Sequence, residues 1–121
     1  MKNFGGEMTF ALSTGQRIVV RGTVEIMPTN LNVEGGANQD GSVYRTAEPT
    51  GYSANLTFED MPNDVWNEIY RASGFNLTLN EIFNGAQHLW TDAGFTGRPS
   101  VNRINGEVSG VAILAAAYKK I

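Results

Sequence analysis

The sequence has no cysteine, a single histidine, His88, and no cluster of basic residues. The absence of cysteine excludes a disulfide framework and a thiolate zinc site, and it suits a reducing compartment. Nine Lys and Arg residues are scattered along the chain and are outnumbered by twelve Asp and Glu residues, which gives a net charge of −3. Tight binding to nucleic-acid phosphates requires clustered basic side chains, so this composition argues against a nucleic-acid-binding protein.

Long apolar runs are also absent. The longest, from Val111 to Tyr118, is far shorter than the ~20 residues that a membrane-spanning helix needs. The segment from Met1 to Glu7 lacks the apolar centre of a signal peptide. We therefore expect no membrane association and a protein made and kept inside a cell, or packaged from it. A chain of 121 residues is long enough for one core, so we expect a single domain, residues 1–121.

Residues with catalytic potential are few. His88 has no cysteine partner and no sequence context for a Ser-His-Asp triad, so we assign it a structural role. Glu59, Asp60 and Asp64 cluster, but acidic groups are also stabilised at the start of a helix, and we prefer that interpretation to an acid–base pair or a metal site. The sequence predicts no enzyme.

Ligand-binding motifs are equally scarce. Asn38–Gly41 lacks the alternating carboxylates of a calcium loop, and Gly35-Gly36 is not followed by the Lys-Ser/Thr of a phosphate loop. Trp66, Tyr70 and Phe75 are more consistent with a core than with a platform for stacking bases, because they share one helical stripe and its exit. We expect no cofactor and no metal.

Alternating polar and apolar residues predict a mainly β fold. From Tyr52 to Glu59 the alternation has the period of two that is typical of a strand with one buried face. Further strands are expected at Met8–Leu12, Arg17–Ile26, Phe75–Leu79, Gln87–Trp90, Ser100–Arg103 and Glu107–Ala117. The first two should pair as a hairpin, and residues 91–99 should be irregular. The run Val111–Ala117 does not alternate, which indicates either a strand covered on both faces or a helix.

One short helix is predicted at about residues 61–73. Asp60 is a candidate N-cap, and Gly74 lies where a left-handed residue ends a helix. Apolar side chains recur at helical spacing on one face and should pack the helix against the sheet. They are Met61, Val65, Trp66, Ile69 and Tyr70.

The segment from Glu34 to Gly51 is polar and rich in glycine. It contains Gly35-Gly36 and Asp40-Gly41, which are typical of turns, and little apolar content. We expect a projecting loop or hairpin at about residues 34–51. So long a stretch without catalytic residue types favours assembly over chemistry.

The succession of these features resembles the tail tube protein family of Mu-like, contractile-tailed bacteriophages. The resemblance extends from about Thr9 to Ala115 and is carried by Arg21-Gly22, Asn32–Gly35, Asp40–Tyr44, Ala47–Pro49, Ala54–Asp60, Phe75–Leu79, Asn84-Gly85, Leu89-Trp90, Gly97–Pro99 and Asn105–Val108. It implies an antiparallel β-sandwich or partly rolled β-barrel with one flanking helix, and no catalytic residues.

The resemblance also implies an assembly. Copies of the subunit would close into hexameric rings, and the rings would stack into a hollow tube in the virion tail through which DNA passes without specific binding. Before assembly the subunit would be in the host cytoplasm, and its partners would be itself and the tail sheath, tape-measure, baseplate and tail-terminator proteins. The acidic balance agrees with a lumen that does not hold DNA.

The polar segment is the best candidate for the contact between rings, because it is long enough to reach a neighbour. The residues expected to make that contact are Glu34, Gly35, Gly36, Asn38, Asp40, Tyr44 and Arg45. Two other interpretations remain open. One is a tube subunit of a related contractile secretion system or phage-derived particle, and the other is a small-ligand-binding β-barrel, for which the scattered Asn and Thr residues show no convergence.

Overall fold

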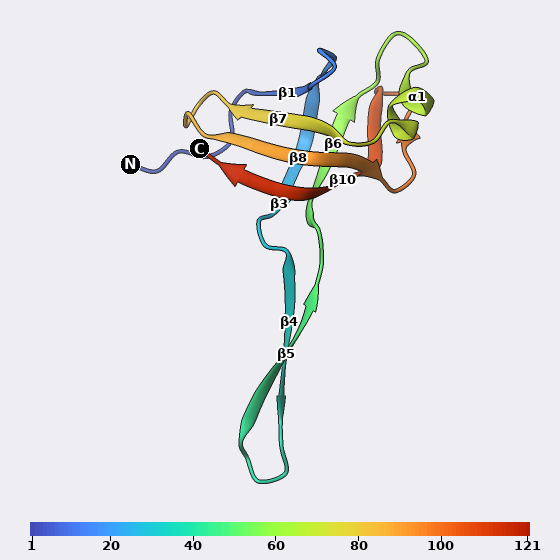
Figure 1. The fold of residues 1–121 in the computed structure, drawn as a ribbon. Helices are drawn as coiled ribbons and strands as arrows, with labels where there is room; N and C mark the ends of the chain where they lie inside the picture. The colour runs from blue at the N-terminus through green and yellow to red at the C-terminus, as the bar shows by residue number, and fades with distance from the viewer.

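Antiparallel strands form two parts of the molecule, a curled sheet and a hairpin that projects from it (Figure 1). The structure is a computed structural model that describes residues 1–121. The strands are β1 (Met8–Leu12), β2 (Arg17–Ile18), β3 (Val20–Met27), β4 (Leu31–Ala37), β5 (Val43–Pro49), β6 (Tyr52–Glu59), β7 (Phe75–Glu81), β8 (Gln87–Thr96), β9 (Ser100–Val101) and β10 (Glu107–Lys120). The only helix, α1 (Trp66–Arg71), lies between β6 and β7. The predicted mainly β fold with one helix is confirmed.

The sheet curls until it is almost closed. Its strand order is β2-β1-β7-β8-β10-β6-β3, with β9 paired to β10. β1 and β3, near opposite ends of this order, come into contact without a hydrogen-bonded ladder between them. The predicted hairpin of Met8–Leu12 with Arg17–Ile26 is therefore wrong for most of its length, since only Arg17–Ile18 pairs with β1, and β3 pairs with β6 instead.

The core lies inside the curl. In β6, Ala54, Leu56 and Phe58 are buried, as the alternation predicts. Phe58 is at the centre of an aromatic cluster, with ring centroids 5.2 Å from Phe10 and 6.1 Å from Trp66. Aromatic side chains that meet in this way supply a large part of the apolar area that stabilises a small domain.

The apolar run in β10 is a strand that is covered on one face only. Val111, Ile113 and Ala115 are buried, whereas the side chain of Leu114, on the opposite face, is 46% exposed. Within the chain a single curled sheet has one interior, and no other element covers the outer face of β10, so a sandwich interior is not what covers it. Cover of that face by a neighbouring subunit stays a prediction. The expectation of irregular structure at residues 91–99 also fails, because β8 continues to Thr96 in pairing with β10.

The helix is shorter than predicted. α1 begins at Trp66 and not near Met61, and its N-cap, Val65, makes no side-chain capping hydrogen bond. Asp60 is not the cap because its carboxylate is occupied by two other donors, the indole N–H of Trp66 at 3.0 Å and the guanidinium of Arg103 at 2.7 Å. The five side chains of the predicted stripe still face the core. Trp66 and Ile69 are buried, and Met61, Val65 and Tyr70 are partly buried against it.

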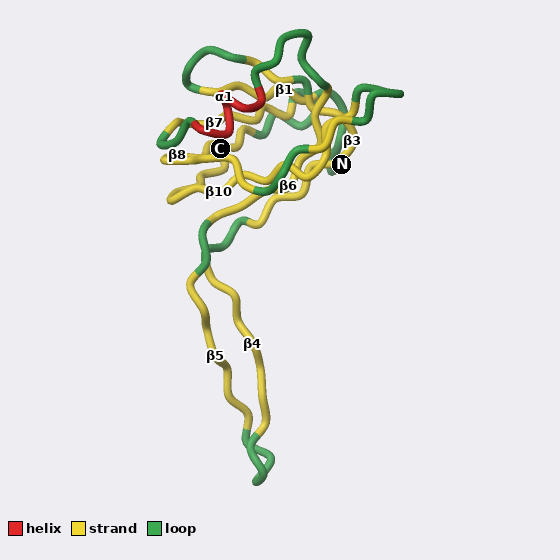
Figure 2. Tube along the Cα trace, turned by 90° about the vertical axis from the view of Figure 1, so that its right-hand side faces the viewer, coloured by secondary structure: helices red, strands yellow, loops and turns green.

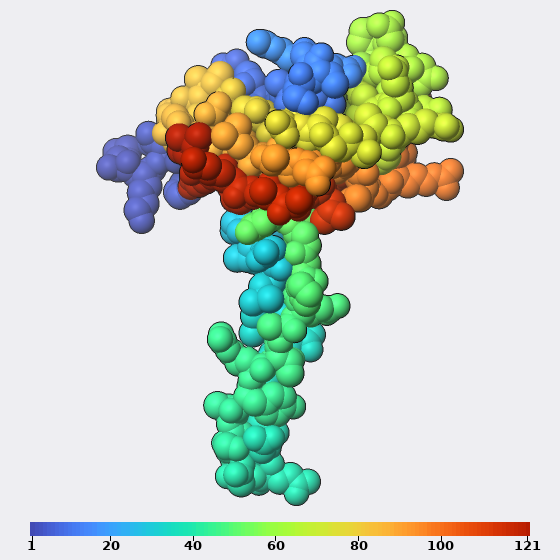
Figure 3. Space-filling model, viewed as in Figure 1, coloured from blue at the N-terminus to red at the C-terminus, as the bar shows by residue number.

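The segment between β3 and β6 forms a separate two-stranded sheet. β4 and β5 pair in register from Leu31 opposite Pro49 to Ala37 opposite Val43. The hairpin extends away from the sheet as a long finger in both ribbon and tube views (Figure 2). The space-filling view shows that the finger stands free of the body along its length (Figure 3).

Candidate assembly surfaces

The finger exposes almost every residue that it contains. From Met27 to Thr50 all residues except Gly36 are exposed, and apolar side chains are among them, Val43 at 81%. A two-stranded hairpin alone in water is marginally stable at best, because it has no core to bury. Exposed apolar groups on such a finger favour contact with another chain.

The seven residues predicted to contact a neighbour all lie on this finger. Glu34, Gly35 and Gly36 are on β4, Asn38 and Asp40 are in the turn, and Tyr44 and Arg45 are on β5. Gly36 lies directly opposite Tyr44, and a Cβ atom at position 36 would be 2.5 Å from the Tyr44 ring. Glycine is therefore required here if the tyrosine ring is to lie across the strand pair.

The tip of the finger is held by its own polar groups. Oδ1 of Asp40 accepts hydrogen bonds from the backbone N–H of Ser42 at 2.9 Å and from its hydroxyl at 2.6 Å. Nδ2 of Asn38 donates to the same hydroxyl at 2.9 Å. The hydroxyl and backbone bonds from Ser42 lower the pKa of Asp40, so the tip presents a carboxylate. Oδ2 of that carboxylate makes no hydrogen bond within the chain.

The outer surface of β3, β6, β10 and β8 is a second uncovered surface, which we call the open face. Pairing across these strands aligns two rows of side chains on the side of the sheet that faces away from the core. The rows contain Glu25, Asn55, Ala112 and Thr96, then Met27, Ser53, Leu114 and Gly94. Glu25 is the only charged residue in these two rows, whose other members are neutral and include the large side chains Met27 and Leu114. Lys119 of β10, opposite Leu89, lies outside them.

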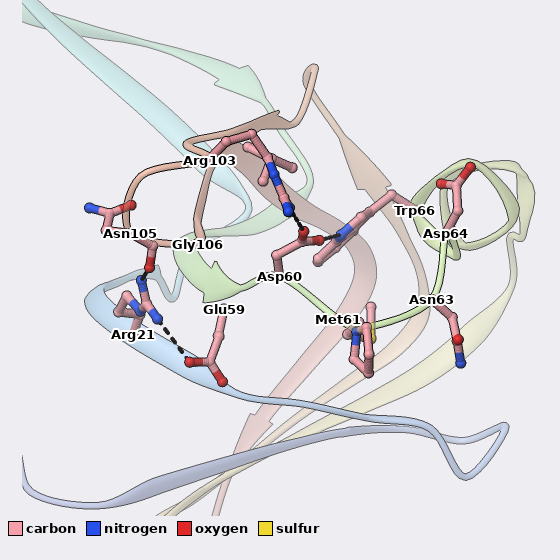
Figure 4. A pocket seen from close by; sticks show the side chains of 12 residues that line it. Arg21, Glu59, Asp60, Met61, Asn63, Asp64, Trp66, Arg103, Asn105 and Gly106 are labelled. Atoms are coloured by element: carbon pink, nitrogen blue, oxygen red, sulfur yellow. Dashed lines mark hydrogen bonds and ion pairs between the residues drawn. The ribbon is translucent and has the colours of Figure 1, made fainter.

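A third feature is a pocket of about 640 Å³ at the end of β6 that is remote from the finger. Two ion pairs line it, Arg21 with Glu59 at 2.8 Å and Arg103 with Asp60 at 2.7 Å (Figure 4). Arg21 also donates to the backbone carbonyl of Asn105. Arg103, in contrast, bonds only to Asp60, and its side chain is 80% exposed.

Comparison with known proteins identifies the relatives of this chain. A family model described as phage tail tube protein matches residues 1–113. The chain belongs to the phage tail tube protein family. No curated protein matches the sequence significantly. As a tail tube protein it has a structural role in the phage tail, where tube subunits assemble with one another, and its single short helix is not one that could cross a membrane.

The carboxylates considered for chemistry are separated in this tail tube protein. Glu59 and Asp60 each form an ion pair with a different arginine, and Asp64 forms none. The expected helix-start role therefore fails for Asp60, which links the Trp66 indole to Arg103. The pocket itself was not predicted, because its residues come from distant segments: Arg21 and Asn105, which both line it, are 84 positions apart.

His88 is buried in a polar and aromatic cluster inside the sheet. Its Nε2 bonds to the Glu81 carboxylate and its Nδ1 to the Tyr118 hydroxyl at 2.7 Å, while its ring stacks on the Tyr118 ring at 5.9 Å. Burial, and then the Glu81 charge, raise the pKa of Tyr118, which keeps its hydroxyl protonated and able to donate to Nδ1. This arrangement ties β7, β8 and β10 together and leaves the imidazole no free nitrogen.

Replacing His88 with Ala should lower the free energy of unfolding by about 2 kcal/mol, because it leaves Oε2 of the largely buried Glu81 carboxylate without its donor. Tyr118→Phe, which removes one neutral hydrogen bond and keeps the ring, should cost about 1 kcal/mol. Chemical denaturation followed by tryptophan fluorescence measures both. Equal, negligible losses would show that the cluster does not stabilise the sheet.

Proposed function

We propose that the protein is the major tail tube subunit of a Mu-like, contractile-tailed phage. In this proposal residues 1–121 act as one tail tube domain, copies of which close into hexameric rings that stack into a hollow tube through which DNA leaves the capsid. The observation that carries the proposal is the exposed finger, a 31–49 hairpin with surface apolar groups and no core of its own, in a chain of the tail tube family.

The finger supports stacking. Because it extends away from the body on one side only, its contact with another copy joins two different surfaces. Such heterologous contacts repeat indefinitely unless a rotation closes them. A contact along the finger axis therefore builds a filament, and we place the inter-ring contact on Glu34, Gly35, Gly36, Asn38, Asp40, Tyr44 and Arg45.

The sheet supports ring closure. β3 ends the strand order, and its outer edge has no hydrogen-bonded partner. Unpaired backbone groups on an edge strand are a template for pairing with another chain, and a closed ring of such contacts leaves no edge free. Lateral contact between neighbouring bodies would satisfy these groups.

The open face supports DNA passage. The two rows contain no Lys or Arg side chain that could release counterions from DNA, which argues against tight binding of its phosphates there. We place this face toward the lumen, where Glu25 would repel DNA weakly and the neutral residues would offer its phosphates no charge. The tail sheath, tape-measure, baseplate and tail-terminator proteins would be the other partners, in the virion tail after assembly from the host cytoplasm.

Purified protein at rising concentration should form hollow tubes or rings of uniform width in negative-stain microscopy, and a cryo-microscopy map of the tubes should have sixfold symmetry. Protein that stays monomeric in light scattering at all concentrations would contradict the proposal and favour a small-ligand-binding barrel. Sheath and tape-measure genes beside the gene for this chain would separate a phage tail from a secretion tube.

A further inference from the structure

The finger and the pocket lie at opposite ends of the same pair of strands. β3 and β6 lead into the finger at Met27 and Tyr52, and at their other end they carry Arg21 and Glu59, which line the pocket. Eight residues of β6 separate the two ends by about 23 Å at the usual rise per residue. A subunit with a projection at one end and a hollow at the other is suited to head-to-tail contact.

We propose that the pocket receives the finger tip of a copy in the adjacent ring, with Arg103 binding the Asp40 carboxylate. This inference rests on the proposed stacking of rings and names the surface that receives the finger. It commits to a second copy of the chain as the occupant of the pocket.

The chemistry of the two surfaces is complementary. Asp40 uses Oδ1 within its own turn and leaves Oδ2 free, whereas Arg103 uses one nitrogen, Nη1, on Asp60. A guanidinium has five N–H donors in a planar fork, so Arg103 keeps donors for a second carboxylate. Both groups are already positioned, Asp40 by Ser42 and Arg103 by Asp60, which reduces the side-chain entropy lost on contact.

The other charges in the pocket are largely paired. Arg21 forms an ion pair with Glu59, and Arg103 forms one with Asp60. The third carboxylate in the lining, Asp64, has no ion pair, so the lining carries one net negative charge. Arg45 of the finger, close to the tip, supplies a positive charge that can meet it.

Apolar groups near the tip and the pocket also match. Val43, the first residue of β5 after the turn, is 81% exposed, and Ile104, beside Arg103, is 97% exposed. Met61 and Val101 line the pocket. The pocket volume of about 640 Å³ lies within the ~300–1,000 Å³ typical of sites that enclose a ligand, and is large enough for the side chains of one turn.

The test is a charge exchange between the two surfaces. Asp40→Lys or Arg103→Glu alone should raise the protein concentration at which stacked tubes form by about tenfold or more, because a weak exposed pair is repeated around every ring interface. The double variant should recover most of the loss. Glu48→Lys at the finger base and Arg98→Glu on the body are matched controls and should leave the concentration unchanged.

Circular dichroism and thermal melting of each variant establish that the body is folded. Stacking of both single variants at the wild-type concentration, or loss of stacking in the singles without recovery in the double, would overturn the inference while the proposed function stands. Wild-type protein that forms no stacks would overturn the proposed function, and this inference with it.

A second measurement leaves both charged residues in place. The chain has no cysteine, so Gln39→Cys and Ile104→Cys introduce the only thiols, one at the tip and one beside the pocket. A short bismaleimide should link copies into a ladder of multimers in stacked tubes and should link none in either single-cysteine variant. Tubes of the double-cysteine protein that give no ladder would place the finger tip elsewhere.

Discussion

Removal of the finger is expected to abolish stacking and to leave the body folded. A variant that deletes residues 33–47 and joins Asn32 to Glu48 through Asn-Gly keeps two residues that are paired in the hairpin, and closes them with a dipeptide suited to a two-residue turn. Because no residue of the finger belongs to the core, the melting temperature should change little. Loss of every inter-ring contact should prevent tubes at concentrations about a hundredfold above those that suffice for the wild type.

Asn30→Ala is the control for the finger deletion. Asn30 is exposed just before β4, at the base of the finger, and its side chain makes no hydrogen bond within the chain, so this variant should stack normally. Negative-stain microscopy counts tubes, and light scattering measures the mass of the remaining species. Rings or monomers are both expected products, whereas full-length tubes formed by the deletion variant would remove the finger from the ring-to-ring contact.

Most of the fold could be predicted from the sequence because the patterns that indicate its strands are local. Alternation along Tyr52–Glu59 depends only on which face of the strand is buried, and the structure has that strand with the same bounds. Gly85, in the connection between β7 and β8, has a positive φ of 79°, a backbone conformation that glycine adopts without steric cost.

The predictions that failed concern partners distant in the sequence. Asp60 has the chemistry of an N-cap, but the indole of Trp66 and Arg103, which is 43 residues away, occupy its two oxygens. The sequence did not decide between a loop and a hairpin for the polar segment before β6, because its residues are exposed and show no alternation of buried and exposed positions. The structure shows a hairpin, with β4 paired to β5. Which of its residues contact a neighbouring subunit is still a prediction.

The division between body and finger follows from where apolar area is buried. All 18 residues of the buried core belong to the curled sheet or to α1, and none lies between Met27 and Thr50. Folding of the body and assembly through the finger should therefore respond to different substitutions. A core variant should unfold the subunit before it affects stacking, and a finger variant should do the reverse.

Phe58→Ala is expected to be the most destabilising single substitution in the body. The Phe58 side chain is 0% exposed, and its ring is 5.2 Å from Phe10, 6.1 Å from Trp66 and 6.4 Å from Phe95. Truncation of a buried phenylalanine removes its transfer free energy and leaves a cavity, at a cost of about 3–5 kcal/mol. Small domains have about 5–15 kcal/mol in total, so this variant should be partly unfolded at 37 °C.

Phe4→Ala makes the same chemical change at a position that is 80% exposed, and it should alter the free energy of unfolding by no more than about 0.5 kcal/mol. Urea denaturation of both variants, followed by tryptophan fluorescence, gives the two values on one scale. The m-value should be unchanged in both, which keeps the comparison within a two-state transition. A Phe58 variant as stable as the Phe4 variant would mean that the aromatic cluster does not hold the curl closed.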